Sequence, residues 1–398
     1  MKANFIHSVI TCAAVLAASS VMSSCNDLRN SIPDEPQKQE ETVSTLNVNM
    51  SFSWEMTKTL PVTLSSSVRT EYTLYLDEEC TTTISSGVIP ADETVEISIT
   101  VPISQEVIYL SYYKESGKVT RAISLTQTKA GASILITDAI EDGSDADERM
   151  KGYVPSQNGK GTLMFEDLYP AIGDYDFNDV VVYYNIVNTK SYGYTSNTTD
   201  ECEINFTVYS KGGAISSDFG LELTGIPASF ASRYSTVTVD GETVSDALKT
   251  SGSDDAVFEF NTSGGKYDSS KLMSFPKKTI SIKLSKDNMD DFTGSTYFSS
   301  LWSQDNLNWF IVAGGKEIHL KGFKATALAP SQADDTFASS KNLVWGINVP
   351  KAIIPAKEKT DMLKAYPDFK KWVEDDSYRW YESCVEENLA WSASELSF

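Results

Sequence analysis

The sequence is poor in histidine, and this deficit excludes several common kinds of catalytic and metal site. Only two histidines occur in 398 residues, and since His7 lies in the N-terminal apolar region, His319 stands alone in the rest. A Ser-His-Asp triad or a histidine-rich metal site would have to be built around that one residue. His319 lies in an alternating run, residues 317–320, so we expect it to pack or hydrogen-bond on a sheet.

The five cysteines form no recognisable framework. Cys12 and Cys25 lie near the N-terminus, which leaves Cys80, Cys202 and Cys384, and no C-x-x-C motif occurs. Three thiols cannot all pair within one chain. The sequence therefore supports neither a disulfide scaffold nor a zinc site, and at least one free thiol is expected.

Positive charge is scarce as well. The chain has 33 basic and 55 acidic residues, which gives a formal net charge of −22 at pH 7. This balance argues against nucleic acid, or an anionic membrane surface, as the binding partner. Aromatic residues are plentiful, with 19 Tyr and 17 Phe, and together with abundant Thr and Ser they favour strands.

The N-terminus has the pattern of an export signal. A short basic start, residues 1–4, precedes an apolar run, residues 9–22, that is too brief to be a permanent membrane span. Two serines then precede Cys25, as in the signals of bacterial lipoproteins, which are cut before a cysteine that receives lipid. We expect residues 1–24 to be the signal and Cys25 the lipidation site. The alternative is an ordinary secretory signal with an incidental cysteine.

Residues 25–45 predict a flexible tether, because they are polar, contain Pro33 and Pro36, and offer nothing that could bury a core. A chain anchored in this way would lie in the cell envelope, attached to the outer membrane by lipid. The sequence leaves open whether it faces the exterior or the periplasm. Asp27 stands alone where surface-export signals carry an acidic run.

The rest of the chain predicts a mainly β protein. Residues 46–128 contain strictly alternating segments, such as 46–54, 60–64 and 95–101, and this alternation marks strands with one buried face. Six or seven short strands in this length fit an immunoglobulin-like (Ig-like) β-sandwich. Residues 129–160 include an acidic run with Gly and Ser, which predicts an interdomain linker, with an extra cation site as the alternative.

Residues 161–398 predict a larger β-rich domain with a helical element near its C-terminus. Nine short apolar or alternating segments are strand candidates between residues 163 and 349. Beyond them, Met362, Tyr366, Phe369 and Val373 recur at helical spacing. Pro367 should bend or break this helix.

One segment concentrates side-chain oxygens. Asp174, Asp176 and Asn178 occupy alternate positions, and Asp179 follows directly before an apolar strand candidate. Oxygens at every second residue of a turn can converge on one hard cation, and Ca²⁺ takes six to eight of them. The alternative is a loop in which the same side chains cap their own backbone as Asx turns.

The segment does not fit an EF-hand. Asp179 stands where the EF-hand loop needs Gly, and Asn185 stands in place of its bidentate Glu. A calcium site must therefore take ligands from elsewhere, and we expect Glu166 and Asp167 to supply them.

Four segments resemble the signature of LruC-domain proteins, which are bacterial lipoproteins and surface proteins. The first is FEDLYPAIGDYDFNDVVVYYN, residues 165–185; IHLKGFKAT, NLVWGINVP and AYPDFKKW follow in the order that the family shows. Lys321 departs from the pattern, since a proline is common there. The resemblance implies a cell-envelope protein, often with an Ig-like or carbohydrate-binding-like domain ahead, and no catalytic residue carries over.

The sequence as a whole favours a non-catalytic binding or adhesion module, stabilised by calcium, whose partner is a glycan or a surface protein. Trp302 and Trp309 lie near Asp305 and Asn308, a mixture that suits sugar stacking, with the alternative that these aromatics fill the core. The alternatives are a structural or assembly component of the cell surface, and a glycan-active enzyme. No motif singles out a pair of carboxylates for hydrolysis.

Overall fold

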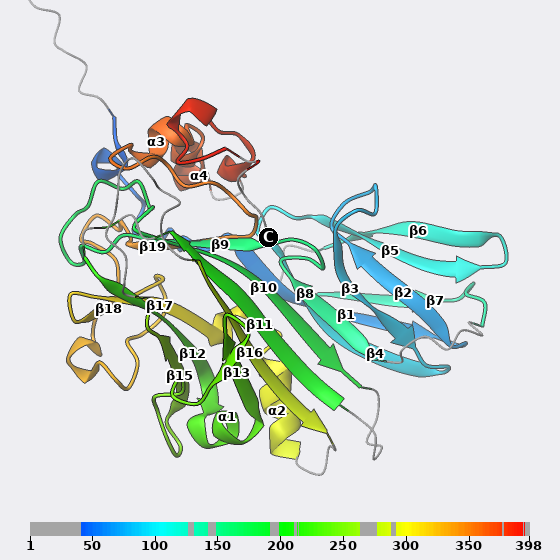
Figure 1. Cartoon of the computed structure of the whole chain (residues 1–398). Helices are drawn as coiled ribbons and strands as arrows, with labels where there is room; N and C mark the ends of the chain where they lie inside the picture. Colours follow the sequence, from blue (N-terminus) through cyan, green and yellow to red (C-terminus); the bar gives the residue numbers. More distant parts are fainter. Residues whose placement is uncertain are drawn as a thin grey trace, which may run out of the picture. The chain divides into compact units, whose positions relative to one another are not determined.

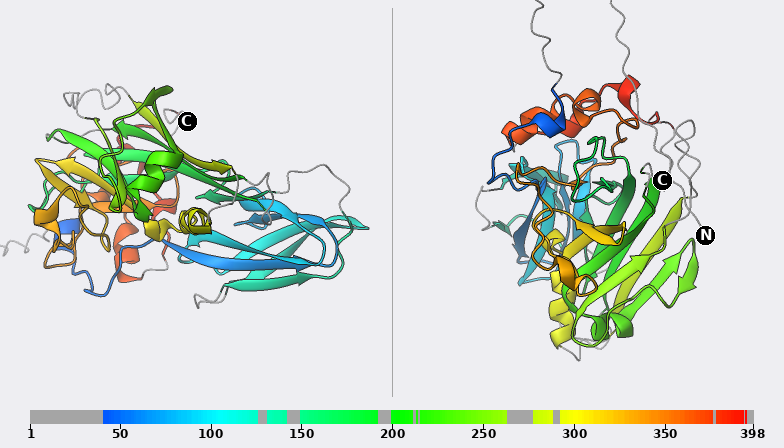
Figure 2. Two further views of the ribbon diagram at one scale, coloured as in Figure 1. Left: turned by 90° about the horizontal axis from the view of Figure 1, so that it is seen from below. Right: turned by 90° about the vertical axis from the view of Figure 1, so that its left-hand side faces the viewer.

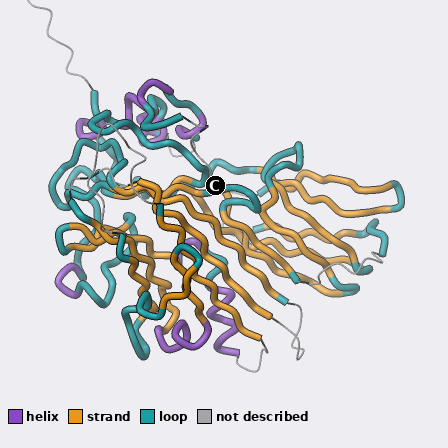
Figure 3. Tube along the Cα trace, in the orientation of Figure 1, coloured by secondary structure: helices purple, strands orange, loops and turns teal. Residues whose placement is uncertain are grey.

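A computed structural model describes ten stretches of the chain: residues 41–125, 131–141, 149–191, 199–210, 213, 215–262, 277–287, 292–375, 378–392 and 394. The predicted signal, the lipidation site Cys25 and most of the predicted tether lie outside the described residues. The described residues from 41 onward form one compact unit. This unit is mainly β, with few helices, as the sequence predicted (Figure 1, Figure 3).

The N-terminal part is a β-sandwich. One sheet has the strand order β4-β1-β7, and β1 and β7 run parallel. The second layer has the order β3-β2-β5-β6. Apolar residues from both layers form a single core, because alternate positions of each strand point inward. The strands are β1 (Thr57–Ser66), β2 (Thr70–Tyr75), β3 (Thr83–Ile89), β4 (Glu93–Pro102), β5 (Val107–Lys114), β6 (Gly117–Ser124) and β7 (Ala132–Ile136).

The C-terminal part is a second pair of packed sheets. Its larger layer continues through β14-β13-β16-β11-β10-β8, and its smaller sheet has the order β15-β12-β17-β18. One apolar core contains residues from both layers. The elements are β8 (Met150–Val154), β9 (Gly161–Phe165), β10 (Val180–Lys190), β11 (Thr199–Ser210), β12 (Ser217–Pro227), α1 (Ala228–Tyr234), β13 (Ser235–Val239), β14 (Glu242–Val244), β15 (Asp255–Phe260), β16 (Lys278–Asp287), α2 (Phe292–Ser300), β17 (Leu307–Ala313), β18 (Lys316–His319) and β19 (Gly346–Val349).

Strand β10 has two different partners along the same edge. Its first half, Val180 to Tyr184, pairs with β9, and its second half, Ile186 to Lys190, pairs with β8. β19 extends this arrangement by pairing with the other edge of β9. The loop that enters β10 therefore lies where three strands meet.

Strand β8 joins the two parts into one continuous sheet. It pairs with β10 on one side and with β3 of the N-terminal sandwich on the other, through Ser85 opposite Gly152. Trp302, which follows α2, reaches into the N-terminal core and is 6% exposed. A side chain at Gly152 would collide with its ring, since a Cβ there would lie 2.5 Å from Cζ3. The indole of Trp302 therefore requires a glycine, which has no side chain, at this position of β8.

The segment that precedes β1 packs against the C-terminal helical element, as Figure 2 shows in two further views. Val43 is fully buried, and its N–H donates to Asp361 Oδ2 at 2.9 Å. Phe52 and Trp54 contact Trp372, with ring centroids 5.0 and 5.5 Å from its own. The packed part of the chain therefore begins before the predicted end of the tether at residue 45.

Three local predictions can be compared with the described elements. Residues 46–54 bury Leu46, Val48, Phe52 and Trp54 as expected, but Met50 is 66% exposed. The segment forms no strand, because its buried residues pack on the helical element rather than along a sheet edge. The predicted linker, residues 129–160, includes strands β7 and β8, and residues 142–148 of its acidic run lie outside the described residues. The predicted break at Pro367 is confirmed, since it separates α3 (Met362–Ala365) from α4 (Phe369–Glu374).

In the part of the chain that the structure describes, no helix has the length and apolar character needed to cross a membrane.

Replacing Trp302 should destabilise the whole protein, because its ring fills the N-terminal core from a C-terminal loop. We expect Trp302→Ala to lower the free energy of unfolding by about 3–5 kcal/mol, the usual cost of emptying a buried aromatic site. Trp302→Phe should cost clearly less, since it restores part of the volume. Urea unfolding followed by circular dichroism measures both, and an unchanged midpoint for Trp302→Ala would show that the joint contributes nothing.

Candidate metal site

The acidic loop, residues 166–179, connects β9 to β10 at the point where their antiparallel pairing ends. Phe165 pairs with Val180, so the two ends of the loop lie side by side. The backbone N–H of Glu166 donates to the carbonyl of Trp345, just before β19, at 2.8 Å. The acidic loop is therefore attached at its two ends to the paired strands β9 and β10, and through Glu166 to the residue before β19.

Two buried aromatic residues flank one acidic residue in the acidic loop. Tyr175 and Phe177 are fully buried in the core beneath the helical element, and both have positive φ angles, 54° and 53°. Left-handed backbone costs a non-glycine residue about 1–2 kcal/mol, so burial of the two rings must offset this cost. Asp176 lies between them and is itself buried.

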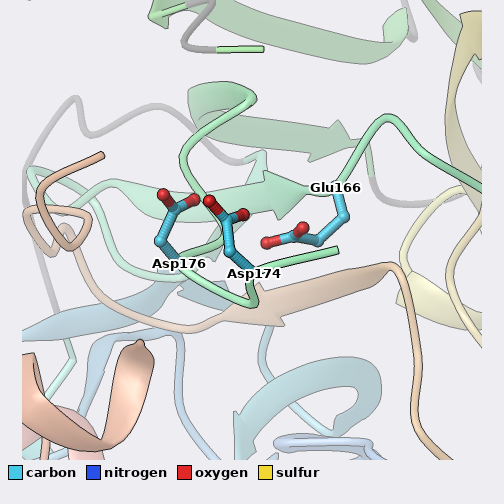
Figure 4. Close-up of side chains that lie close together, drawn as sticks. All are labelled: Glu166, Asp174 and Asp176. Atoms are coloured by element: carbon cyan, nitrogen blue, oxygen red, sulfur yellow. The ribbon is translucent and has the colours of Figure 1, made fainter. Parts of the chain in front are cut away.

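Glu166, Asp174 and Asp176 form a cluster in which one carboxylate oxygen from each lies within 4.8 Å of the others (Figure 4). Glu166 and Asp176 are buried, whereas Asp174 is exposed. Glu166 Oε1 accepts the N–H of Phe177 at 2.7 Å. Its other oxygen, Oε2, is buried and has no hydrogen-bond partner among the described residues. The cluster thus contains a buried acceptor that the protein leaves unsatisfied.

Gly173 makes room for this unsatisfied oxygen. A Cβ at position 173 would lie 2.2 Å from Glu166 Oε2, far closer than such atoms approach one another. Any larger residue would force the glutamate to rotate. The glycine therefore permits the observed position of the Glu166 carboxylate, which belongs to the cluster.

A distant segment, residues 356–362, closes the site from the other side. Asp176 Oδ2 accepts the N–H of Lys359 at 2.7 Å, and its Oδ1 accepts the N–H of Asn178 at 3.1 Å. The amide of Asn178 donates to the carbonyl of Ala356 at 3.1 Å, while its own oxygen is buried without a described partner. The N–H of Met362 donates to the carbonyl of Tyr175 at 3.0 Å.

Asp167 and Asp179 form a second acidic pair beside the cluster. Asp179 Oδ2 accepts the N–H of Asp167 at 2.8 Å, and Asp167 Oδ2 accepts the N–H of Ile215 at 3.1 Å. These bonds tie the two ends of the acidic loop together and connect them to the start of the smaller sheet. Both side chains are buried.

The carboxylates perturb one another strongly. Burial, and then the charges of Asp179, Asp176 and Asp174, raise the pKa of Glu166 well above its usual value. Burial and neighbouring carboxylates also raise the pKa of Asp176 and of Asp179 to about 8. Glu358 on the closing segment has a raised pKa for the same reasons, burial first and then the charges of Asp174 and Asp167. The site holds more negative charge than its surroundings neutralise.

The sequence located the main members of this site but not all of its partners. The alternate positions of Asp174 and Asp176 place both in the cluster, and Glu166 joins them. Asp167 and Asp179 pair with each other instead, and one Asx-type bond, from the N–H of Asn178 to Asp176, is present. The closing segment, residues 356–362, lies about 180 residues away, and no local pattern signals its approach.

The predicted sugar-stacking pair is wrong. Trp309 is 1% exposed in the core between the C-terminal sheets, and Trp302 fills the N-terminal core. Both rings are packed inside apolar cores, so neither is exposed for stacking on a sugar. The alternative that these aromatics form core is confirmed for both residues.

His319 packs on a sheet as predicted. Its ring is fully buried and stacks on Phe310 with centroids 4.7 Å apart. Nδ1 lies 2.6 Å from Asn308 Oδ1 and Nε2 lies 2.9 Å from Glu317 Oε2. Burial lowers the pKa of His319. The three cysteines beyond the N-terminal region, Cys80, Cys202 and Cys384, are free.

Comparisons with known proteins place the fold but not the function. Residues 197–381 are similar to a family described as a domain of unknown function (DUF4842). No curated protein matches the sequence. A solved structure from Bacteroides ovatus, named only provisionally as a lipoprotein, is similar over 80% of this chain and 98% of its own, with 20% identity and a TM-score of 0.61. Such a likeness shows the fold alone, and the resemblance to LruC-domain proteins stays a prediction.

In the presence of chelator, we expect the stability of the protein to fall as the pH rises from about 4 to 8. Asp176 and Asp179 have a usual pKa of 3.8, and their native values of about 8 mean that the folded state binds more protons in this range. Stability from a raised carboxyl pKa is present at low pH and is lost as the pH passes the native value. Melting temperatures measured from pH 4 to 8 test this.

The charge-removing variant Asp176→Asn should flatten this pH dependence, whereas Glu115→Gln, on an exposed turn of the N-terminal sandwich, should leave it unchanged. Stability that rises between pH 4 and 8 in chelator would contradict the electrostatic account of the site.

Proposed function

We propose that this protein is a lipid-anchored component of the cell envelope, a non-catalytic binding module whose acidic loop holds Ca²⁺. One observation carries the metal: Glu166, whose buried Oε2 has no described partner, has a carboxylate oxygen within 4.8 Å of oxygens of Asp174 and Asp176. A buried acceptor without a donor is costly, and a cation bound by all three side chains removes that cost.

The donor set favours calcium over other metals. Glu166, Asp174 and Asp176 offer only carboxylate oxygens, and no histidine or cysteine belongs to the cluster. Oxygen-only sites suit hard cations, whereas zinc and copper sites use imidazole or thiolate. Asp174 is exposed, so water can reach the cluster and complete the six to eight ligands that Ca²⁺ takes.

Calcium bound here would act on structure rather than on chemistry. Asp176 also accepts the N–H of Lys359, and Tyr175 accepts that of Met362, so the acidic loop is bonded directly to the segment before the helical element. Neutralising the cluster would strengthen this attachment, because the deprotonated carboxylates would no longer repel one another. The metal would therefore hold the β9–β10 loop and the helical element together.

The Asx-turn alternative explains only part of the geometry. It accounts for the bond from the N–H of Asn178 to Asp176, but it leaves Glu166 Oε2 and the oxygen of Asn178 without donors. Protonation of the carboxyl groups would reduce the repulsion. A cation achieves the same at neutral pH and also supplies the missing partner.

The envelope location rests on different observations. The export signal and Cys25 predict lipidation, and a protein with the same fold is itself provisionally named a lipoprotein. The lipid would anchor the chain in the outer membrane, and a glycan or a surface protein is the expected partner of the folded unit. Assembly of the cell surface and glycan hydrolysis remain the alternative roles.

Calorimetric titration of a chain lacking residues 1–40 should detect Ca²⁺ binding, because residues 41–398 form one compact unit. Asp176→Asn and Glu166→Gln should each weaken binding at least tenfold, since each removes a charged ligand. Glu115→Gln serves as the matched control and should bind like the parent. Absence of binding heat at millimolar Ca²⁺, with a melting temperature indifferent to chelator, would refute the metal site.

Gly173→Ala tests the geometry without changing any charge. The added methyl should displace the Glu166 carboxylate through its contact with Oε2, so calcium affinity should fall while the fold in chelator stays intact. Calcium titration and melting temperature, compared with those of the parent, separate the two effects. An alanine variant that binds calcium as tightly as the parent would exclude Glu166 Oε2 as a ligand.

A further inference from the structure

A cavity of about 500 Å³ shares no residue with the acidic loop. Several segments line it: residues 54–57, part of β12, the first residue of β15, residues 304–305 with the start of β17, the turn at residues 320–325, and β19. Its lining includes exposed residues such as Asp305 and Lys324 and buried ones such as Gln304 and Asn308, so it leads from the surface into the protein. Its volume is in the usual range for small-molecule sites.

Two residues of the lining each have a buried polar atom without a partner. Gln304 Oε1 and Thr224 Oγ1 are both buried without a hydrogen bond from any described residue, and the Gln304 side chain is 9% exposed. Buried polar groups in folded proteins are almost always satisfied, by protein or by something bound. An amide oxygen accepts hydrogen bonds, and a hydroxyl both accepts and donates. The missing partner must therefore carry hydrogen-bond donors.

A rigid carboxylate lies on the same wall. Asn308 donates to Glu222 Oε2 at 2.6 Å and to the carbonyl of Lys324 at 2.9 Å. Its oxygen lies 2.6 Å from His319 Nδ1, so the amide is held on every side. Glu222 is thereby fixed in position, and no described donor reaches its second oxygen, Oε1.

The charges around the cavity select against anions. Glu55, Glu222, Asp255 and Asp305 line it, against Lys321 and Lys324. Lys321 is already bonded to the carbonyl of Phe52 and to Asn342 Oδ1, each at 2.6 Å. Carboxylates outnumber lysines in the lining, so acceptors predominate there, which suits a ligand rich in hydroxyl groups.

Apolar surface completes the lining. Phe323 is half-buried, and Met56, Leu320 and Ala325 add aliphatic contacts. A sugar ring has the matching character, because its C–H faces pack on apolar groups while its hydroxyls donate outward.

We propose that this cavity binds a neutral carbohydrate, whose hydroxyl groups donate to Gln304 Oε1 and Glu222 Oε1 and bond with Thr224 Oγ1. The inference rests on the proposed binding role and names its ligand class and its site. It does not depend on calcium, since the two sites have no residue in common.

The test uses neutral methyl glycosides and disaccharides of hexoses, pentoses, deoxyhexoses and N-acetylhexosamines. Putrescine is included as a cationic ligand for comparison. Ligand-observed NMR on the lipid-free chain identifies the sugar that binds, and calorimetry measures its affinity. Thr224→Val removes one hydroxyl at constant shape and should weaken binding roughly five- to tenfold. Thr243→Val, on an exposed strand outside the cavity, is the matched control and should bind like the parent.

Ala325→Phe places a ring in the cavity and should abolish binding while the melting temperature stays near that of the parent. Sugar binding that survives both Thr224→Val and Ala325→Phe would overturn the site but leave the binding role standing. Binding of putrescine in place of every sugar, or of no probe at all, would overturn the ligand class. Sugar affinity should persist in Asp176→Asn with chelator, so failure of the calcium site would be seen separately.

Discussion

The burial of like charges at the entrance to β10 is the constraint on which the C-terminal half of this protein depends. Glu166, Asp176 and Asp179 are all buried, and the charges of Asp176 and Asp179 raise the pKa of Glu166. Isolated buried charges are unstable, so the loop needs backbone donors, protons or a cation. The N–H of Lys359 supplies one donor, and it comes from the segment before the helical element. The same groups that make the loop unfavourable therefore also determine what packs against it.

A second constraint makes the two β-sandwiches behave as one compact unit. β8 belongs to the sheet of both, and the ring of Trp302 enters the N-terminal core over the bare backbone of Gly152. The N-terminal segment returns to the C-terminal part through Val43 and Trp54. The proposed sugar cavity uses this arrangement, because residues 54–57 form one of its walls. Calcium would then stabilise the framework, and the ligand would bind elsewhere on it.

Much of the fold could be predicted because strand periodicity is local. Alternating apolar residues marked β1 and β4, and the oxygen-rich motif before Val180 contains two members of the carboxylate cluster, Asp174 and Asp176. The sequence predictions failed where apolar or aromatic residues are present because they are buried in a core, and not because they belong to a strand or a binding surface. Residues 46–54 alternate because they cover the helical element, and Trp302 and Trp309 are aromatic because they fill cores. Composition cannot tell an aromatic platform from an aromatic core, since both need the same side chains.

The amino-acid sequence by itself determined the mainly β class, the scarcity of histidine and cysteine chemistry, and the spacing that sets Asp174 and Asp176 on one side of a loop. These properties depend on residue type and on neighbours in the chain. Tertiary structure alone decided that Glu166 Oε2 lacks a donor, that residues 356–362 close the acidic loop, and that Gln304 and Thr224 meet in one cavity. Each of these facts is a contact between distant segments, and such contacts follow from packing of the whole chain rather than from any local pattern.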